Sequence, residues 1–411
     1  MEYSCMGRPL ADFRIVFPEN CSHGEDFLAY ELQCAIYRAT RMVMPITHCS
    51  TGAEAYEILI GGTSSEPGFW TVDTEGHKLV IRGTNLFGYM DAATFFNDQI
   101  FYPEPGRFDG VIPKNWHKKR LIYQDVFEKK TASYRIIFQN VWGMDCPAVA
   151  NRANYIVEYC TAFGADVIGL NEYFGDFLTG GAVQQRLEAN GYAEVPVKKD
   201  ASLFQGSVEP IFYRTAKLRL LESGYVDFWM HDASKGATVA VFEDADAPEK
   251  RFAAICTHLS AAYACTQAEK YLRQLKNLQF LLPEVDRVCR QWGEIPIFIG
   301  GDFNCYCTTE TFQKMLLSGF SDVHEIAEYT NDRCSCHGYP VYCSALHSFV
   351  TGTLTNEAPY RDGIDHVFVR NEKKARITMY RTMQESIVPV ISDHCPHLLD
   401  FDILGEKGET V

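Results

Sequence analysis

In the second part of this sequence, acidic, amide and imidazole side chains recur where an apolar run ends. A carboxylate just after a buried strand is costly to desolvate unless it meets a cation or another strong partner. Side chains that follow neighbouring strands can also converge at one edge of a sheet. We therefore expect the following residues to form a single site: Asn140, Glu172, His258, Asp302, Asn304, Asp365, Asp393 and His394.

The chemistry of this set is that of metal-assisted phosphate ester hydrolysis. Carboxylate and amide oxygens are the ligands that Mg²⁺ prefers, and Mn²⁺ accepts them as well. Histidine exchanges protons near neutral pH, and a neighbouring carboxylate orients it and raises its basicity. Amide N–H groups can bind a phosphoryl oxygen as charge builds on it. The sequence contains no P-loop, no Gly-rich dinucleotide turn and no nucleophilic serine elbow that would point to other chemistry.

The segments that carry these residues are, in chain order, FQNVWGMD, DVIGLNEYF, ICTHL, FIGGDFNCYCTT, GIDHVFV and ISDHCPHLLDF. In this order they resemble the motifs of the endonuclease/exonuclease/phosphatase family, over about residues 132–405. The resemblance implies a four-layered α/β/β/α sandwich that cleaves phosphoester bonds with a divalent metal. One motif departs from the family, since LNE stands where many relatives have LQE, but Glu172 itself is retained.

The resemblance also implies a role for each residue. On the metal side, Glu172 would be the principal ligand, Asn140 would help to hold the metal or the substrate, and Asp393 would complete the set.

On the catalytic side, Asp302 would lie beside the attacking water or the metal, and Asn304 would bind a phosphoryl oxygen. His394 would act as the base or polarise the phosphate, oriented by Asp365. His258 would stabilise the transition state from across the cleft. Whether Asp302 or His394 takes the proton is left open by the motifs.

Short apolar runs alternate with helical patterns from residue 134 onward, and this texture predicts the elements that position the site. Several runs are continuously apolar, which is typical of strands buried on both faces. Helices between such strands predict a layered sandwich with sheets inside and helices outside. The expected strands cover 134–141, 166–172, 208–214, 252–259, 295–304, 363–370 and 395–403, and the expected helices cover 148–163, 181–190 and 266–292.

Residues 1–130 predict a separate, small α+β module of the order β-α-β-β-α. Its expected strands are 13–17, 56–60 and 78–82, and its expected helices are 25–42 and 85–98. The prolines of segment 101–120 and the charges Lys118, Lys119 and Arg120 indicate a linker, so that 131–411 forms the catalytic domain. The patterns YEILIGGT and KLVIRGTNLFGYMDAATFF resemble the small domain that precedes some glycosidase catalytic domains. That resemblance implies a glycan contact or a packing role.

The composition and the net charge limit the binding partners that we expect for this protein. The chain has 38 Lys and Arg against 53 Asp and Glu, a net charge of -15, which disfavours general duplex DNA binding. No apolar run approaches the roughly 20 residues of a membrane-spanning helix, and the start lacks a secretory signal pattern. The 15 cysteines are therefore read as reduced thiols of a cytoplasmic protein.

A second candidate metal site lies in the segment NDRCSCHGYPVYCSALH, whose ligand types suit zinc. Its spacing lacks the matched second pair of ligands that zinc sites commonly have. Zinc binding and plain reduced thiols both stay open for Cys334, Cys336, His337, Cys343 and His347.

Three functions follow from these observations. The leading hypothesis is a Mg²⁺-dependent phosphoesterase acting on a phosphorylated small molecule or a lipid headgroup. The alternative is a Mg²⁺-dependent endonuclease or exonuclease acting on DNA or RNA. The third, a catalytically silent glycan-binding scaffold, requires the loss of a motif acid, and none is missing.

Overall fold

The computed structural model describes residues 3–405, apart from 51, 63–68, 85, 102–110, 113–116, 122–129, 144–151, 175–181, 198–208, 229–234, 262–264, 337–340, 344–347, 351–357 and 384–391.

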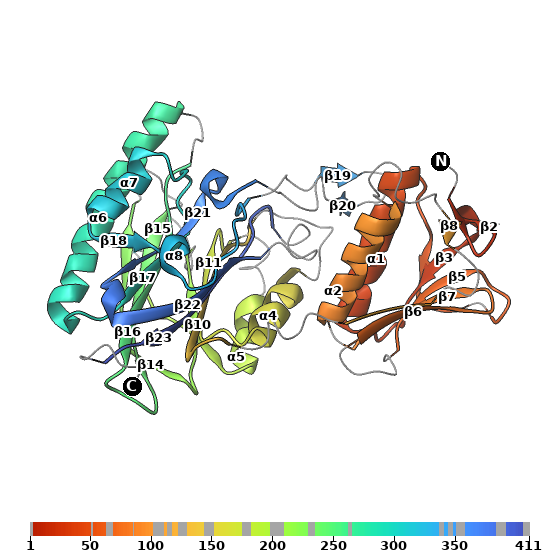
Figure 1. Ribbon diagram of the computed structural model, residues 1–411, viewed down its shortest axis with the longest axis horizontal. Helices are drawn as coiled ribbons and strands as arrows, with labels where there is room; N and C mark the ends of the chain where they lie inside the picture. The colour runs from red at the N-terminus through yellow and green to blue at the C-terminus, as the bar shows by residue number, and fades with distance from the viewer. Residues whose placement is uncertain are drawn as a thin grey trace.

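Two six-stranded mixed sheets pack face to face in the part of the chain after residue 130 (Figure 1). Sheet I has the spatial order β12 (Tyr192–Glu194), β13 (Ile211–Arg214), β11 (Val167–Asn171), β10 (Tyr134–Asn140), β23 (His397–Ile403) and β22 (Ala375–Thr382). Sheet II has the order β14 (Leu218–Asp227), β15 (Gly236–Asp244), β16 (Arg251–His258), β17 (Ile297–Asp302), β21 (Asp365–Arg370) and β18 (Phe320–Asp322).

Aromatic side chains join the two sheets. The ring of Phe401 from sheet I lies 4.3 Å from that of Phe298 and 5.2 Å from that of Phe252, both from sheet II (centroid distances). All three side chains are buried. Tilted and edge-on pairs of this kind add about 0.5–1.5 kcal/mol each to the free energy of area burial. This aromatic layer fixes one sheet on the other.

Helices cover the outer faces of both sheets. Helix α6 (Gln267–Trp292) begins with a capping box between Thr266 and Glu269, and it packs Leu281 and Val285 onto sheet II. Helices α4 (Arg152–Ala162) and α5 (Ala182–Ala189) cover sheet I (Figure 1). The expected four-layered α/β/β/α sandwich is confirmed. Two short helices follow the site strands in sequence, α7 (Glu310–Leu317) and α8 (Val323–Ile326).

The first 121 residues form an additional α+β layer. Helices α1 (His23–Thr40) and α2 (Leu86–Phe95) lie on one face of a six-stranded sheet (Figure 1). That sheet has the order β4 (Ile46–Thr47), β3 (Arg14–Val16), β5 (Glu57–Ile60), β7 (Lys78–Arg82), β6 (Phe69–Glu75) and β9 (His117–Leu121). A smaller sheet has the order β2 (Arg8–Pro9), β1 (Ser4–Cys5) and β8 (Val111–Ile112).

The prediction of a linker over 101–120 is wrong in its second half. Lys118, Lys119 and Arg120 lie on β9, which pairs antiparallel with β6 at the edge of the N-terminal sheet. The charge run therefore belongs to a strand and not to a linker. The predicted domain boundary at 130 stays a prediction.

Side chains of α1 contact α4 and link the N-terminal layer to the sandwich. The Tyr155 hydroxyl donates to Asp26 Oδ2 at 2.9 Å, and its ring lies 5.8 Å from that of Phe27. His23 Nδ1 lies 2.6 Å from Glu158 Oε2. One apolar cluster contains residues from both parts of the chain. No described helix is long and apolar enough to cross a membrane.

Candidate active site

Strand register brings the predicted residues of sheet II side by side. In the parallel pair β16 and β17, His258 is opposite Asp302, and in the antiparallel pair β17 and β21, Asp302 is opposite Asp365. On sheet I, Asn140 and Asn171 are opposite each other at the ends of β10 and β11, and Glu172 follows at once. Five strands therefore deliver their terminal polar groups to one edge of the sandwich.

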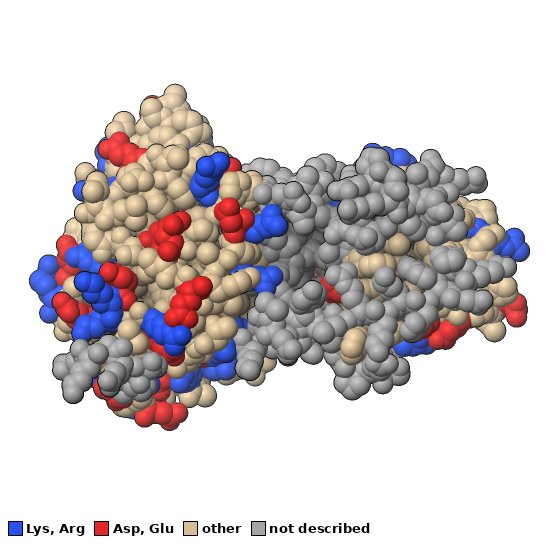
Figure 2. Space-filling view, in the orientation of Figure 1, with Lys and Arg blue, Asp and Glu red and all other residues tan. Residues whose placement is uncertain are grey.

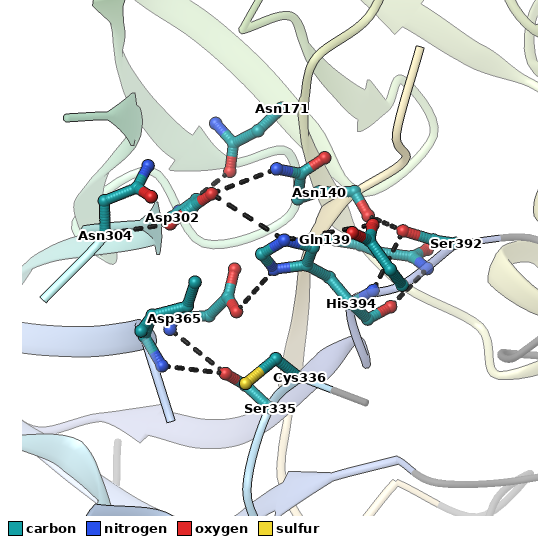
Figure 3. Close-up of polar contacts among 12 residues, drawn as sticks. Gln139, Asn140, Asn171, Asp302, Asn304, Ser335, Cys336, Asp365, Ser392 and His394 are labelled. Atoms are coloured by element: carbon teal, nitrogen blue, oxygen red, sulfur yellow. Dashed lines mark hydrogen bonds and ion pairs between the residues drawn. The ribbon is translucent and has the colours of Figure 1, made fainter. Parts of the chain in front are cut away.

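Asp302 is the central carboxylate of the site (Figure 3). Its Oδ2 accepts a hydrogen bond from Asn140 Nδ2 at 3.0 Å and lies 3.2 Å from His258 Nε2 and 3.9 Å from His394 Nε2. Its Oδ1 accepts from the backbone N–H of Asn304 at 2.8 Å. Asp302 is only 2% exposed, so these contacts replace water around the carboxylate.

His394 and Asp365 form a buried pair next to this carboxylate. His394 Nδ1 lies 2.8 Å from Asp365 Oδ2, which directs the opposite ring nitrogen, Nε2, toward Asp302 (Figure 3). Asp393 Oδ1 lies 3.9 Å from the same Nε2. The predicted orientation of His394 by Asp365 is present in the geometry.

Two serines hold this pair in place, and the motifs gave no sign of them. Ser335 Oγ accepts hydrogen bonds at 3.1 Å from the backbone N–H groups of Ile364 and Asp365. Ser392 Oγ donates to the carbonyl of Asn140 at 2.7 Å and accepts from the His394 N–H at 3.1 Å. Both serines are fully buried, so they fix the backbone on either side of the pair.

Asn171 links the two sheets directly beneath the site. Its Nδ2 donates to the carbonyl of Thr257 at 3.0 Å, and its Oδ1 accepts from the Asp302 N–H at 3.0 Å. A Cβ at Gly301 would lie 2.1 Å from the Thr257 carbonyl and 2.7 Å from Asn171 Oδ1, and Gly301 has a φ of +135°. Glycine in FIGGDFN is therefore required for this close approach.

Two of the predicted site residues have left-handed backbone. Glu172 has a φ of 56° and Asn304 a φ of 51°. Asparagine tolerates this region, whereas glutamate rarely adopts it. Glu172 Oε1 lies 3.9 Å from His258 Nε2, and Asn304 Nδ2 lies 3.2 Å from the same nitrogen. In both cases the turn brings the side chain back toward His258, at the cost of local strain.

Lys235 also lies in the site, and the sequence analysis did not predict it. Its Nζ lies 2.6 Å from His258 Nε2 and 3.0 Å from Nδ1, and the residue is 4% exposed. It precedes β15, in which Gly236 is paired with His258. Nothing in the local sequence marks this lysine, because only the pairing of two strands places it there.

The protonation of the site reflects an excess of buried carboxylates. Burial would raise the pKa of Asp302, but the imidazoles of His258 and His394 outweigh it and lower that pKa. Burial raises the pKa of Asp365 to about 6 and also raises that of Asp393. Burial would lower the pKa of His394, but Asp365 and Asp393 raise it well above its ordinary value. Asp365, Asp393 and His394 therefore keep their protons to a higher pH than usual.

The donor set fits a divalent cation. Ligand atoms of Glu172, His258 and Asp302 lie within 4.8 Å of one another, as do those of Asp302, Asp365 and His394. Asp393 Oδ1 is buried and makes no hydrogen bond to any described residue. Carboxylate oxygens next to a buried orphan oxygen are what a hard cation such as Mg²⁺ coordinates.

All eight predicted site residues thus lie at one edge of the sandwich, and their individual roles stay predictions. The zinc prediction falls largely outside the described residues, which exclude His337, His347 and the side chain of Cys343. Cys334 Sγ and Cys336 Sγ lie 3.4 Å apart. Among the described residues, no group of three metal-binding side chains includes a cysteine.

Comparison with known proteins gives consistent results. An endonuclease/exonuclease/phosphatase family protein from Bacteroides thetaiotaomicron is similar in structure, with a TM-score of 0.51 and 17% identity over 66% of this chain and 96% of that one. The mannosyl-6-phosphatase Bt3783 of the same organism gives a TM-score of 0.51 and 18% identity over 66% of this chain and 99% of that one. At this identity the similarity concerns the fold. No curated protein matches the sequence.

The sequence profile of the Endonuclease/Exonuclease/phosphatase family matches residues 137–394, which is more than half of the chain and includes every predicted site residue from Asn140 to His394. The chain belongs to the endonuclease/exonuclease/phosphatase family.

Proposed function

We propose that this protein is a divalent-metal-dependent phosphoester hydrolase acting on a small phosphorylated molecule. The family name covers nucleases and phosphatases, which share the hydrolysis of a phosphoester bond. The observation that carries the proposal is the convergence of Glu172, Asp302, His258 and His394 from both sheets, with Asp302 Oδ2 within 3.9 Å of both imidazoles.

The metal belongs with Glu172 and Asp302, with Asp393 close by. Mg²⁺ is the first candidate and Mn²⁺ the second, because the oxygen donors suit both. A divalent cation bound there supplies charge neutralisation for the phosphoryl oxygens. Asn140 contributes by holding Asp302, since its Nδ2 donates to that carboxylate and its Oδ1 accepts from the Trp142 N–H.

The protein's own groups then handle the water and the phosphate. Asp302, kept ionised by the imidazoles, accepts a hydrogen bond from the attacking water and orients it. His394, which the carboxylates keep protonated, donates from Nε2 to a phosphoryl oxygen, while Asp365 holds its Nδ1. Asn304 Nδ2 lies 3.2 Å from His258 Nε2, and both groups donate as negative charge builds on the phosphoryl oxygens.

Surface charge favours a small substrate over duplex DNA. On the described part of the face shown in Figure 2, Lys and Arg are interspersed with Asp and Glu and form no continuous basic stripe. The net charge of -15 points the same way, because duplex binding relies on cationic contacts to many phosphates. A phosphorylated metabolite or lipid headgroup needs only the site itself. The glycan contact of the N-terminal layer stays a prediction.

The test is hydrolysis of p-nitrophenyl phosphate and bis-p-nitrophenyl phosphate with added Mg²⁺ or Mn²⁺. We expect turnover that EDTA abolishes, and a loss of at least about 10³-fold in Glu172→Gln. Asp322→Asn is the control, because Asp322 belongs to a separate carboxylate–histidine group outside the site. Full activity in Glu172→Gln would falsify the proposal.

A comparison of substrates distinguishes the nuclease alternative from the proposed function. Plasmid DNA, oligoribonucleotides and a panel of phosphorylated metabolites and lipid headgroups are compared at the same enzyme and metal concentrations. Efficient cleavage of either nucleic acid with no turnover of the small phosphates would reverse the order of the two hypotheses.

A further inference from the structure

We propose that Lys235 is a further catalytic residue, which binds the phosphoryl group of the substrate through its ammonium. This inference rests on the proposed function and names the charge state of substrate that the site prefers. It is carried by the position of Lys235 and by the partners of its buried charge.

The position of Lys235 is fixed by strand pairing. Gly236, the first residue of β15, is opposite His258, the last residue of β16, so Lys235 reaches the edge where the site strands end. A Cβ at Gly236 would lie 2.1 Å from the Tyr225 hydroxyl, which excludes a larger residue there without rearrangement. Lys235 Nζ contacts the His258 ring at 2.6 and 3.0 Å. The ammonium therefore lies within the site rather than at the protein surface.

This ammonium forms no direct ion pair with a described carboxylate. Among the described residues, no carboxylate oxygen lies within 4.0 Å of Lys235 Nζ, and its contacts there are to a single imidazole. An ammonium has three N–H donors, and a neutral imidazole offers one acceptor nitrogen. A buried cation without a counter-charge is costly. At 4% exposure, water cannot surround it.

The nearby carboxylate of Asp302 already accepts hydrogen bonds from other groups. Asp302 lies close enough to Lys235 for the lysine to contribute to its lowered pKa, but its oxygens are engaged by Asn140, Asn304 and the imidazoles. Once a divalent cation is bound at Glu172 and Asp302, their charge is shared with that cation. The anion that balances the charge of Lys235 must then belong to a bound ligand. A phosphoryl group has the required negative charge and hydrogen-bond acceptors.

The positive charge of Lys235 predicts a preference between phosphomonoesters and phosphodiesters. During hydrolysis the P–O bond to water forms while the water proton passes to Asp302, and the P–O bond to the leaving group breaks. The leaving group departs as an oxyanion that takes a proton from solvent, and negative charge is spread over the remaining phosphoryl oxygens. An ammonium against these oxygens stabilises a monoester dianion more than a diester monoanion. We therefore expect Lys235 to favour phosphomonoesters.

The experiment measures binding of inorganic phosphate by titration calorimetry in the presence of Mg²⁺. In Lys235→Met we expect the dissociation constant for phosphate to rise at least about 10-fold, the size of effect of one charged contact. Lys235→Arg keeps the charge and should recover most of the affinity. Lys217→Met is the matched control, since Lys217 pairs with Asp244 at the opposite end of β15.

Two further readouts separate phosphate binding from a structural role. Mn²⁺ affinity and the circular dichroism spectrum report whether the variants fold and retain the metal site. The ratio of kcat/KM for p-nitrophenyl phosphate to that for bis-p-nitrophenyl phosphate should fall in Lys235→Met, whereas a general loosening of the site lowers both alike. If Lys235→Met does not fold, the comparison is made with Lys235→Gln and Lys235→Arg.

The outcomes are distinguishable from those of the proposed function. Phosphate binding that depends on Lys235 in a protein without hydrolase activity supports this inference and contradicts the function. Phosphate affinity that is unchanged in a folded Lys235→Met or Lys235→Gln overturns the inference, even where hydrolysis is normal. Absence of phosphate binding to the unmodified protein overturns it as well.

Discussion

Asp302 shows how one carboxylate organises the site. Four groups meet its two oxygens: the Asn140 amide, the Asn304 backbone and two imidazoles. Each group comes from a different element, so the position of the carboxylate depends on several strand ends at once. Substitutions around it are therefore expected to affect turnover well before they affect folding.

Asp365→Asn tests the pairing with His394. The amide keeps a similar shape but removes the negative charge that helps to raise the pKa of His394 and to hold its Nδ1 proton. We expect kcat to fall by about 10²–10⁴-fold, the range of one lost acid–base group, with a smaller change in KM. Steady-state kinetics with p-nitrophenyl phosphate measure both constants.

The control is Asp322→Asn, whose side chain keeps its acceptor toward Tyr360. Equal kcat in Asp365→Asn and Asp322→Asn would show that the pair has no role in the reaction.

At this scale the sequence predicted the residues with a motif and missed those without one. The eight predicted side chains follow strands and lie within recognisable segments. Lys235 and Asn171 reach the site through strand pairing and sheet packing, which a local pattern does not encode. Ser335 and Ser392 are common residues that become functional only through the backbone groups they contact.

The segment Cys334–Cys336 supports the pair formed by His394 and Asp365. Ser335 holds the backbone of Asp365, and Cys336 makes a β-bridge with His394, so one tripeptide contacts both members of the pair (Figure 3). The orientation of His394 therefore depends on a segment with no expected chemistry of its own.

Ser335→Ala removes an acceptor shared by two buried N–H groups. Unsatisfied buried groups cost about 1–3 kcal/mol, and we expect the free energy of unfolding to fall by this amount. We also expect kcat to fall about 10-fold while the Mn²⁺ affinity is retained. Urea unfolding and kinetics test the two parts, and Ser335→Thr, which restores the hydroxyl, should recover activity. A normal kcat in Ser335→Ala would leave Ser335 with a purely structural role.

Strand β23 contains a histidine that makes the fold sensitive to acid. Burial lowers the pKa of His397 from 6.5 to about 3, and its Nδ1 lies 2.7 Å from the Tyr380 hydroxyl. Because the folded pKa is below the unfolded one, this stabilisation is complete above pH 6.5 and declines as the pH falls toward 3. Between pH 7 and pH 4.5 the loss is about 3 kcal/mol.

Urea unfolding at several pH values measures this loss. The variant His397→Gln should show a shallower decline in the free energy of unfolding than the unmodified protein. His77→Gln, at a half-exposed position in the turn between β6 and β7, should keep the original slope. Identical slopes for the unmodified protein and His397→Gln would exclude His397 as the source.

Element prediction succeeded where apolar runs were long and failed where they were not. β15 was missed although the Thr, Val and Phe residues of GATVAVFED favour a strand. β14 was missed because it is an edge strand, and most of its side chains are only partly buried. β9 was assigned to a linker, since its apolar content is low and its pairing partner lies more than 40 residues earlier in the chain.

For the whole molecule, the contact between α1 and α4 couples the N-terminal layer to the sandwich. Tyr155 is 3% exposed and meets Phe27 and Asp26 from the other part. A shared apolar cluster of this kind predicts that both parts unfold together. We expect a single calorimetric transition for the unmodified protein.

Tyr155→Ala should lower the free energy of unfolding by about 3–5 kcal/mol, as for other large aromatic truncations, and separate the transition into two. The control Tyr329→Ala removes an exposed ring and should change stability by no more than about 0.5 kcal/mol. A single, unshifted transition in Tyr155→Ala would mean that the two parts are energetically independent.

The division of the site between the sheets has a consequence for how activity returns after denaturation. His258 and Asp302 come from sheet II, whereas Glu172 and His394 adjoin strands of sheet I. A refolding chain that has formed one sheet, or both sheets undocked, holds only half of the ligands and no Asn171 bridge. The recovery of turnover therefore reports when the two sheets dock. It should lag behind the return of the spectroscopic signals of helices and strands.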